Sequence, residues 1–150
     1  MNKIITLELL KNLEKYFKDN INNEIEYYNV EFGTSLQKIN NITYNAIKKQ
    51  LPELYIGIEQ TNFEYEDFSS VGNVKITNNF YISLAYRTNE FDFQDNVERY
   101  IYILINMLEK YTDENVLLLL IKNCKRGELQ SENMQTIKII NIDFDIITNK

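Results

Sequence analysis

The amino-acid sequence predicts one α+β domain over residues 1–150, in which an antiparallel sheet of four or slightly more strands packs against an amphipathic helix, with helices at the N-terminus. Two observations support this class. Apolar residues recur every three or four positions in some stretches and every second position in others, which indicates helices and strands in one chain. The composition, 44% hydrophobic and 25% charged, is ordinary for a single globular core. We therefore expect an N-terminal helical segment, 1–52, and a sheet-and-helix core, 53–150.

The N-terminal segment begins with an amphipathic helix of about 15 residues. Its apolar positions are Leu9, Leu10, Leu13, Tyr16 and Phe17. We expect Asp19 and Asn20 to end or kink this helix. Helical spacing then resumes from Ile21 to Phe32, which favours a continued or second helix that stops at Gly33.

Pro52 is the only proline and marks the boundary between the two parts. The spacing of Ile39, Ile47 and Leu51 is compatible with another short helix before it, although the stretch 40–47 is also rich in residues that favour strands. The conformation of residues 21–52 therefore stays open at this point.

After Pro52 the hydrophobic period changes to two, which predicts a strand over 54–60. We interpret 61–73 as a long loop or hairpin tip. The alternation over 74–88 predicts either one long strand or two strands that turn at Asn78 and Asn79.

A second helix is predicted over 95–111, where Asp95 and Glu98 have the spacing of a capping box. The stretch 116–123 is apolar on both faces, which predicts a central strand that is covered on both sides. A polar hairpin, 124–134, follows.

The last strand is predicted over 135–148. Its apolar residues change parity at Ile139 and Ile140, which predicts a β-bulge there, because one extra residue would return them to a single face.

Enzymatic chemistry is disfavoured because the chain has no histidine and a single cysteine, Cys124. A Cys–His nucleophile is therefore excluded, and no glycine-rich phosphate loop occurs. Carboxylates cluster at 64–67 and 90–92, but no glycine-containing calcium loop accompanies either cluster. We expect no enzymatic activity, no catalytic residue, no cofactor and no metal site.

The net charge of −6 is concentrated in the middle of the chain. Residues 1–52 carry seven basic and six acidic groups, 53–98 carry two and nine, and 99–150 carry seven of each. The longest apolar run, 116–121, is too short to span a membrane, and the N-terminus lacks the apolar region of a signal peptide. We expect a cytoplasmically made protein that neither enters membranes nor binds nucleic acid sequence-specifically.

The order of elements from Leu54 to Ile147 resembles the tail-terminator and tail-completion (neck) proteins of long-tailed bacteriophages. The resemblance is carried by the strand after Pro52, the acidic insertion, the strand 80–88, the helix 95–111 and the terminal pair of strands. It implies a structural subunit of a phage tail or tail-like particle, made in the bacterial host cytoplasm. Such subunits form a homo-oligomeric ring, which the resemblance implies to be a hexamer, that caps the tail-tube protein and joins it to a neck or connector protein.

Two segments are candidates for contacts between neighbouring subunits of such a ring. Aromatic and acidic residues alternate in the first segment, and the second is basic. The candidate residues are Phe63, Glu64, Tyr65, Glu66, Asp67 and Phe68 in the first, and Lys125 and Arg126 in the second. The acidic middle of the chain would keep DNA from adhering to the lumen of the ring. The alternative function is a small acidic secretion-type chaperone, usually dimeric, or another α+β interaction module.

Overall fold

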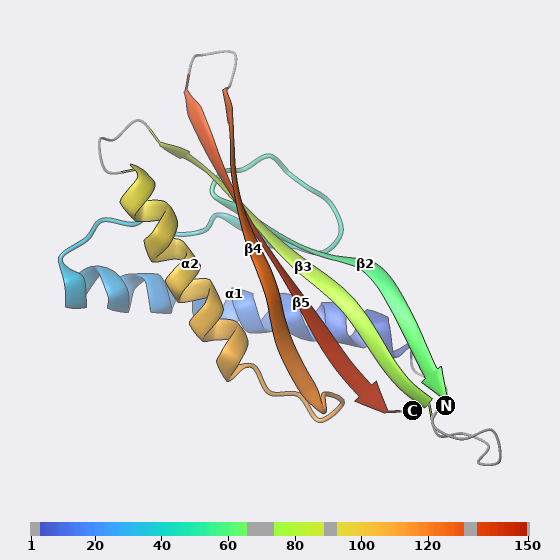
Figure 1. The fold of residues 1–150 in the computed structure, drawn as a ribbon. Helices are drawn as coiled ribbons and strands as arrows, with labels where there is room; N and C mark the ends of the chain where they lie inside the picture. Colours follow the sequence, from blue (N-terminus) through green and yellow to red (C-terminus); the bar gives the residue numbers. More distant parts are fainter. Residues whose placement is uncertain (1–3, 66–73, 89–92, 131–134, 150) are drawn as a thin grey trace.

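The structure is a computed structural model that describes residues 4–65, 74–88, 93–130 and 135–149. Within these residues, five strands form one sheet in the order β1-β2-β3-β5-β4, and two helices lie against one face of it (Figure 1). The elements are α1 (Ile5–Phe32), β1 (Asn41–Thr43), β2 (Glu53–Tyr65), β3 (Val74–Thr88), α2 (Phe93–Lys110), β4 (Leu118–Gln130) and β5 (Thr136–Asn149). Neighbouring strands are antiparallel except β1 and β2, which are parallel. The predicted α+β class is confirmed.

Helix α1 is a single helix of 28 residues that buries every fourth residue from Leu9 to Ile25 against the sheet. The prediction that Asp19 and Asn20 end it is wrong. Both side chains are exposed to solvent, and the Asn20 amide donates to the Tyr16 carbonyl one turn earlier, at 2.8 Å. Neither side chain therefore interrupts the helix. The predicted stop at Gly33 is confirmed, because Gly33 adopts a left-handed conformation with φ of 65°.

Two asparagines of α1 hold the extended chain that follows the helix. The Asn22 side chain accepts from the Ile39 N–H at 2.7 Å and donates to the Ile39 carbonyl at 3.1 Å. Asn29 does the same for Leu36, at 2.8 and 3.0 Å. Each amide side chain thus binds both the N–H and the carbonyl of one extended residue, as a neighbouring strand would. The side chains of Leu36 and Ile39 are buried. Residues 41–43 form a strand and 44–52 contain no helix, so the short helix considered before Pro52 is not formed.

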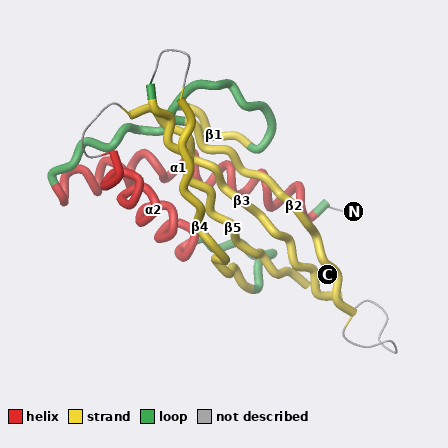
Figure 2. Tube along the Cα trace, turned by 45° about the horizontal axis from the view of Figure 1, so that its top comes forward, coloured by secondary structure: helices red, strands yellow, loops and turns green. Residues whose placement is uncertain are grey.

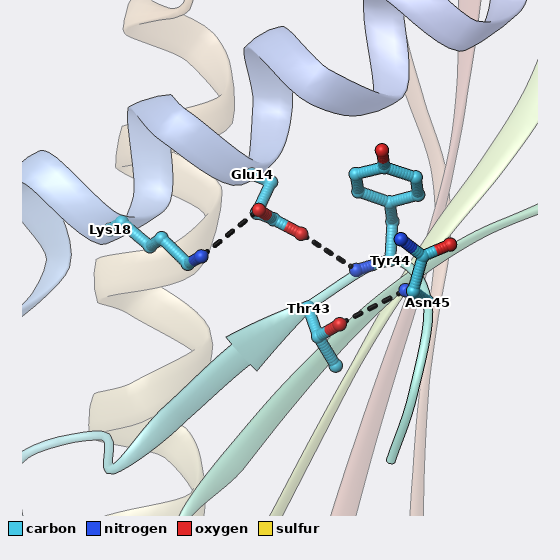
Figure 3. A network of polar contacts seen from close by, with 5 residues as sticks. All are labelled: Glu14, Lys18, Thr43, Tyr44 and Asn45. Atoms are coloured by element: carbon cyan, nitrogen blue, oxygen red, sulfur yellow. Dashed lines mark hydrogen bonds and ion pairs between the residues drawn. The ribbon is translucent and has the colours of Figure 1, made fainter.

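The end of β1 is attached to α1 through Glu14 (Figure 3). One carboxylate oxygen accepts from the Tyr44 N–H at 3.1 Å, and the other accepts from the Lys18 ammonium at 3.0 Å. The Thr43 hydroxyl accepts from the Asn45 N–H at 3.0 Å and turns the chain away from the sheet. Strand β1 therefore stays three residues long and covers only the beginning of β2.

The chain enters β2 through a cis peptide bond between Leu51 and Pro52. The next residue, Glu53, is buried, and its carboxylate accepts from the Asn41 side chain at 2.7 Å and the Lys48 N–H at 2.9 Å. This carboxylate, one of the nine in the acidic middle of the chain, is therefore unavailable to an acidic surface.

Strands β3 and β5 form the centre of the sheet. Their helix-facing residues are fully buried; these are Phe80, Ile82, Leu84 and Tyr86 in β3 and Ile140, Ile142, Phe144 and Ile146 in β5. Strand β3 is one continuous strand, because its pairing with β5 passes through Asn78 and Asn79 without interruption. The β-bulge predicted at Ile139 and Ile140 is absent from this continuous register, so Ile139 lies half-buried on the face opposite the helices.

Helix α2 packs its apolar stripe on the sheet, as predicted, with Leu104 at 1% exposure. Its start differs from the prediction, because the helix begins at Phe93 and Asp95 lies within the first turn. Tyr16 of α1 donates its hydroxyl to the Met107 carbonyl at 2.7 Å, which joins the two helices.

The two outer strands of the antiparallel part of the sheet differ most from the predictions. Residues 61–65 continue β2 and residues 124–130 continue β4, where a loop or hairpin was predicted. The prediction that 116–123 forms a central strand is wrong, because β4 is the last strand of the sheet (Figure 2). Both described helices lie on the same face of the sheet. The apolar side chains on the other face of β4 are therefore not covered by a helix among the described residues.

Candidate protein–protein interface

Strand β4 presents an apolar edge. Leu118, Leu120 and Leu129 are 48%, 38% and 58% exposed, and Leu117 just before the strand is 61% exposed. One side of β4 pairs with β5, and the other side has no strand beside it among the described residues. Its outward N–H and C=O groups are therefore free to pair with a further strand.

A hollow of about 670 Å³ lies where β4 begins, between the strand and the end of α2. Apolar side chains such as Leu108, Val116 and Leu119 line it together with Asp113. The hollow continues the apolar surface of the β4 edge toward the helices.

Asp113 fixes this corner of the molecule. Its carboxylate accepts from the Asn12 amide of α1 at 2.8 Å, the Tyr111 hydroxyl at 2.9 Å and the Asn115 N–H at 2.9 Å. Burial alone would raise the pKa of Asp113, but the hydrogen bonds from Asn115, Asn12 and Tyr111 outweigh it and lower the pKa. The start of β4 is therefore tied to both helices.

The predicted basic residues lie on β4 but on opposite faces. Arg126 is on the helix side, where its guanidinium forms two hydrogen bonds with the carboxylate of Glu98 in α2, at 2.9 and 2.8 Å. These bonds lower the pKa of Glu98. Lys125 pairs with Asn141 in the ladder and is exposed on the other face. Lys122, also on β4, lies 3.4 Å from Asp145 of β5.

The predicted aromatic and acidic residues fall at the end of β2. Phe63 and Tyr65 are 59% and 70% exposed and lie on the helix side of the sheet, because they pair with Ile76 and Val74. Glu64 lies on the opposite face, 3.7 Å from Lys75 of β3. The other three predicted residues, Glu66, Asp67 and Phe68, lie outside the described residues. The structure does not bring the two predicted segments together within one chain, because β3 and β5 separate β2 from β4.

The face of the sheet opposite the helices, here called the uncovered face, is mostly polar in its middle. Asn79 donates to Asp145 at 3.0 Å, and Tyr55 and Tyr81 pack with their ring centroids 6.0 Å apart. Gly57 allows this packing, since a Cβ there would collide with the Tyr81 ring.

A second aromatic surface lies on the helices. Tyr28 of α1 packs against Phe32, with centroids 4.5 Å apart, and against Tyr102 of α2, at 6.0 Å. A shallow hollow of about 240 Å³ lies beside them.

The described residues offer little reactive chemistry. Burial raises the pKa of the Cys124 thiol, which disfavours the reactive thiolate. Within the described ranges, no group of three acidic, cysteine or histidine residues is arranged to hold a metal ion. Neither described helix is both long and apolar enough to cross a membrane.

Comparison with known proteins gives little further information. No protein-family model matches the chain, and no curated protein matches it. Among solved structures, the chain is similar to a chain of the virion of a native gene transfer agent (GTA) particle, with a TM-score of 0.44 and 10% identity, over 73% of this chain and 78% of that one. A likeness at this level implies nothing about what the present chain does.

The exposed leucines of the β4 edge were not predicted from the sequence. Their signal was present, because 116–121 is an uninterrupted run of six aliphatic residues. It was interpreted as evidence for a central strand, whereas an apolar strand at an edge gives the same sequence pattern.

Proposed function

We propose that this chain is a non-catalytic structural subunit of a phage-like tail, which assembles head to tail with its own copies into a ring. The ring would close the tail tube on one side and meet a neck or connector protein on the other. The observation that carries this proposal is the β4 edge, where a long strand leaves both its backbone groups and its leucine side chains without cover among the described residues. A monomer with such an edge is prone to associate, and a ring gives that association a closed form.

The fold is compatible with the family resemblance on which the ring is based. The described residues form an antiparallel sheet packed against helices, the architecture expected for terminator and neck proteins. An acidic lumen would let DNA pass without adhering, and the exposed carboxylates Glu59 and Glu64 are available for it, whereas the buried Glu53 is not.

The test combines mass and shape. We expect light scattering of the purified full chain to give the mass of a closed oligomer, and negative-stain microscopy to show rings. Co-expression with the tail-tube protein from the same gene cluster should yield tubes that carry a ring at one end.

A stable dimer without rings would contradict the proposal and support the chaperone alternative. Two variants are compared: Leu120→Asp, which places a charge on the β4 edge, and Val30→Asp, which places one at an exposed position of α1. Only the first should reduce the mass of the oligomer.

A further inference from the structure

The described sheet has a second open edge besides β4. Strand β1 pairs only with Glu53, Leu54 and Tyr55 of β2. The rest of β2, from Ile56 to Tyr65, has β3 on one side and no strand on the other among the described residues. Each end of the sheet therefore has a strand segment that is paired on one side only among the described residues. These segments, 56–65 and 118–130, are similar in length.

The two edges carry opposite charges. The open part of β2 contains Glu59 and Glu64 and no basic residue. Strand β4 contains Lys122, Lys125 and Arg126 against one acid, Glu128. Pairing β4 with β4 of a second copy across a two-fold axis would bring like charges together, whereas pairing β4 with β2 brings opposite charges together. The charges therefore favour a head-to-tail contact.

The strand directions permit antiparallel pairing of β4 with β2 of the next copy while both copies keep the same orientation. Strand β2 is antiparallel to β3, β3 to β5, and β5 to β4. If the sheet continues from one copy into the next with the helices on the same side, β4 meets the neighbouring β2 in the antiparallel sense.

The side chains also match by face. On the helix side, the half-buried Leu119 and Ile121 of β4 would meet the exposed Tyr65 and Phe63 of β2. On the uncovered face, Leu120 would lie opposite Glu64, with Lys122 beside it. This alignment places residues 119–128 of β4 along the whole open part of β2. Only Leu129 and Gln130 reach the segment that β1 already occupies, so these two residues would not pair.

We propose that β4 of one copy pairs antiparallel with residues 56–65 of β2 in the next copy, with Leu120 opposite Glu64, so that one sheet continues through the ring. This inference rests on the ring of the proposed function and specifies its contact. It differs from the contact that the sequence suggests, in which Lys125 and Arg126 meet Glu64, Glu66 or Asp67 of the next copy. Arg126 is held by Glu98 on the helix side, and Lys125 falls farther along the strand.

Disulfide cross-linking tests the pairing. In a Cys124→Ser background, the chain is made with Glu64→Cys and Leu120→Cys together. Residues directly opposite in an antiparallel ladder have Cα atoms about 4.5 to 5.5 Å apart, which a disulfide can bridge. Each copy then carries one cysteine on β2 and one on β4, so it can be linked to a neighbour on both sides. Oxidation should give a ladder of dimers, trimers and larger species on a non-reducing gel.

Three matched variants serve as controls. Each single cysteine can cross-link no further than a dimer. Glu64→Cys with Lys110→Cys, an exposed position at the end of α2, should give no ladder. Glu64→Cys with Lys125→Cys reports a shifted register, and a stronger ladder from this pair than from the first would overturn the proposed alignment.

The outcomes separate this inference from the ring itself. An oligomer by light scattering without any ladder would disprove the β4–β2 pairing and leave the ring standing. A strong dimer from Leu120→Cys alone would show β4–β4 pairing and overturn the inference. A chain that is monomeric at every concentration and yields no ladder would overturn both the inference and the ring.

Discussion

Strands β5 and β4 are neighbours in the sheet, and their sequences are similarly rich in apolar residues, yet their environments are opposite. Strand β5 lies between two strands and under two helices, and Ile140, Ile142, Phe144 and Ile146 are fully buried. Among the described residues strand β4 has one neighbouring strand, and Leu118, Leu120 and Leu129 are each more than a third exposed. The difference teaches that the hydrophobicity of a strand does not report where in the sheet the strand lies, because a central and an edge strand are about equally apolar here. Four predictions test the contrast.

The largest effect is expected from a charge placed on the covered side. Leu104→Asp puts a carboxylate into a position that is 1% exposed, at a cost of roughly several kcal/mol, which is comparable to the whole stability of a small domain. We expect this variant to be unfolded by circular dichroism. Leu118→Asp at the edge should keep its fold and its midpoint of thermal unfolding as a monomer. A cooperatively folded Leu104→Asp variant would contradict the packing of α2.

The second effect compares the two strands directly. Ile142→Ala removes fully buried methyl groups from β5 and should lower the free energy of unfolding by about 2–5 kcal/mol. Leu120→Ala on β4 should change it by less than about 0.5 kcal/mol when the chain is monomeric. Urea denaturation measures both values, and similar losses in the two variants would mean that the β4 edge is covered within the chain.

A smaller effect is expected where the chain after α1 is attached to the helix. Asn29→Ala leaves the backbone groups of Leu36 without their partner and should cost about 1–3 kcal/mol. Asn23→Ala, at an exposed position of the same helix, is the matched control and should cost almost nothing. Equal losses would show that the asparagine contacts add no stability beyond that of the helix.

The smallest effect concerns Asp113, which ties the open edge to the covered side. Its pKa is lower in the folded chain than the ordinary value of about 3.9, so its contribution to stability is present above that value and is lost as the pH falls through the folded pKa. Asp113→Asn should make the fall in stability below about pH 4 less steep and cost about 1 kcal/mol or less at neutral pH. The comparison is made by urea denaturation at several pH values. An unchanged acid profile would exclude a role for this carboxylate.

The pattern of the sequence predicted the strands and helices that bury apolar side chains on the helix-covered side. It did not predict the single polar contacts or the position of β4 at the end of the sheet. The period of Phe80, Ile82 and Leu84 identified the buried face of β3, because alternation follows directly from the pleat. The asparagine contacts of Asn22 and Asn29 have no such period, and in a chain rich in asparagine they do not stand out.

The role of Phe63, Glu64 and Tyr65 in an interface stays a prediction. The structure changes their setting, because they belong to a strand rather than a loop. The leucines of β4 were seen as apolar and assigned to the wrong place, because local sequence does not determine the order of strands in a sheet.

The three-residue strand β1 has a geometric consequence for the proposed assembly. The pairing can be followed across the sheet of one chain: Gly127 of β4 lies opposite Ile139, Ile139 opposite Ala85, and Ala85 opposite Glu53 of β2. Gly127 and Glu53 are therefore at the same height in the sheet, and β1 already pairs with Glu53. A neighbour cannot join at that level and must slide along the strands. Leu120 is level with Gln60 by the same ladders, so its placement opposite Glu64 is a shift of four residues, or about 13 Å. A closed ring accommodates such shear by inclining every strand to its axis, as a β-barrel does.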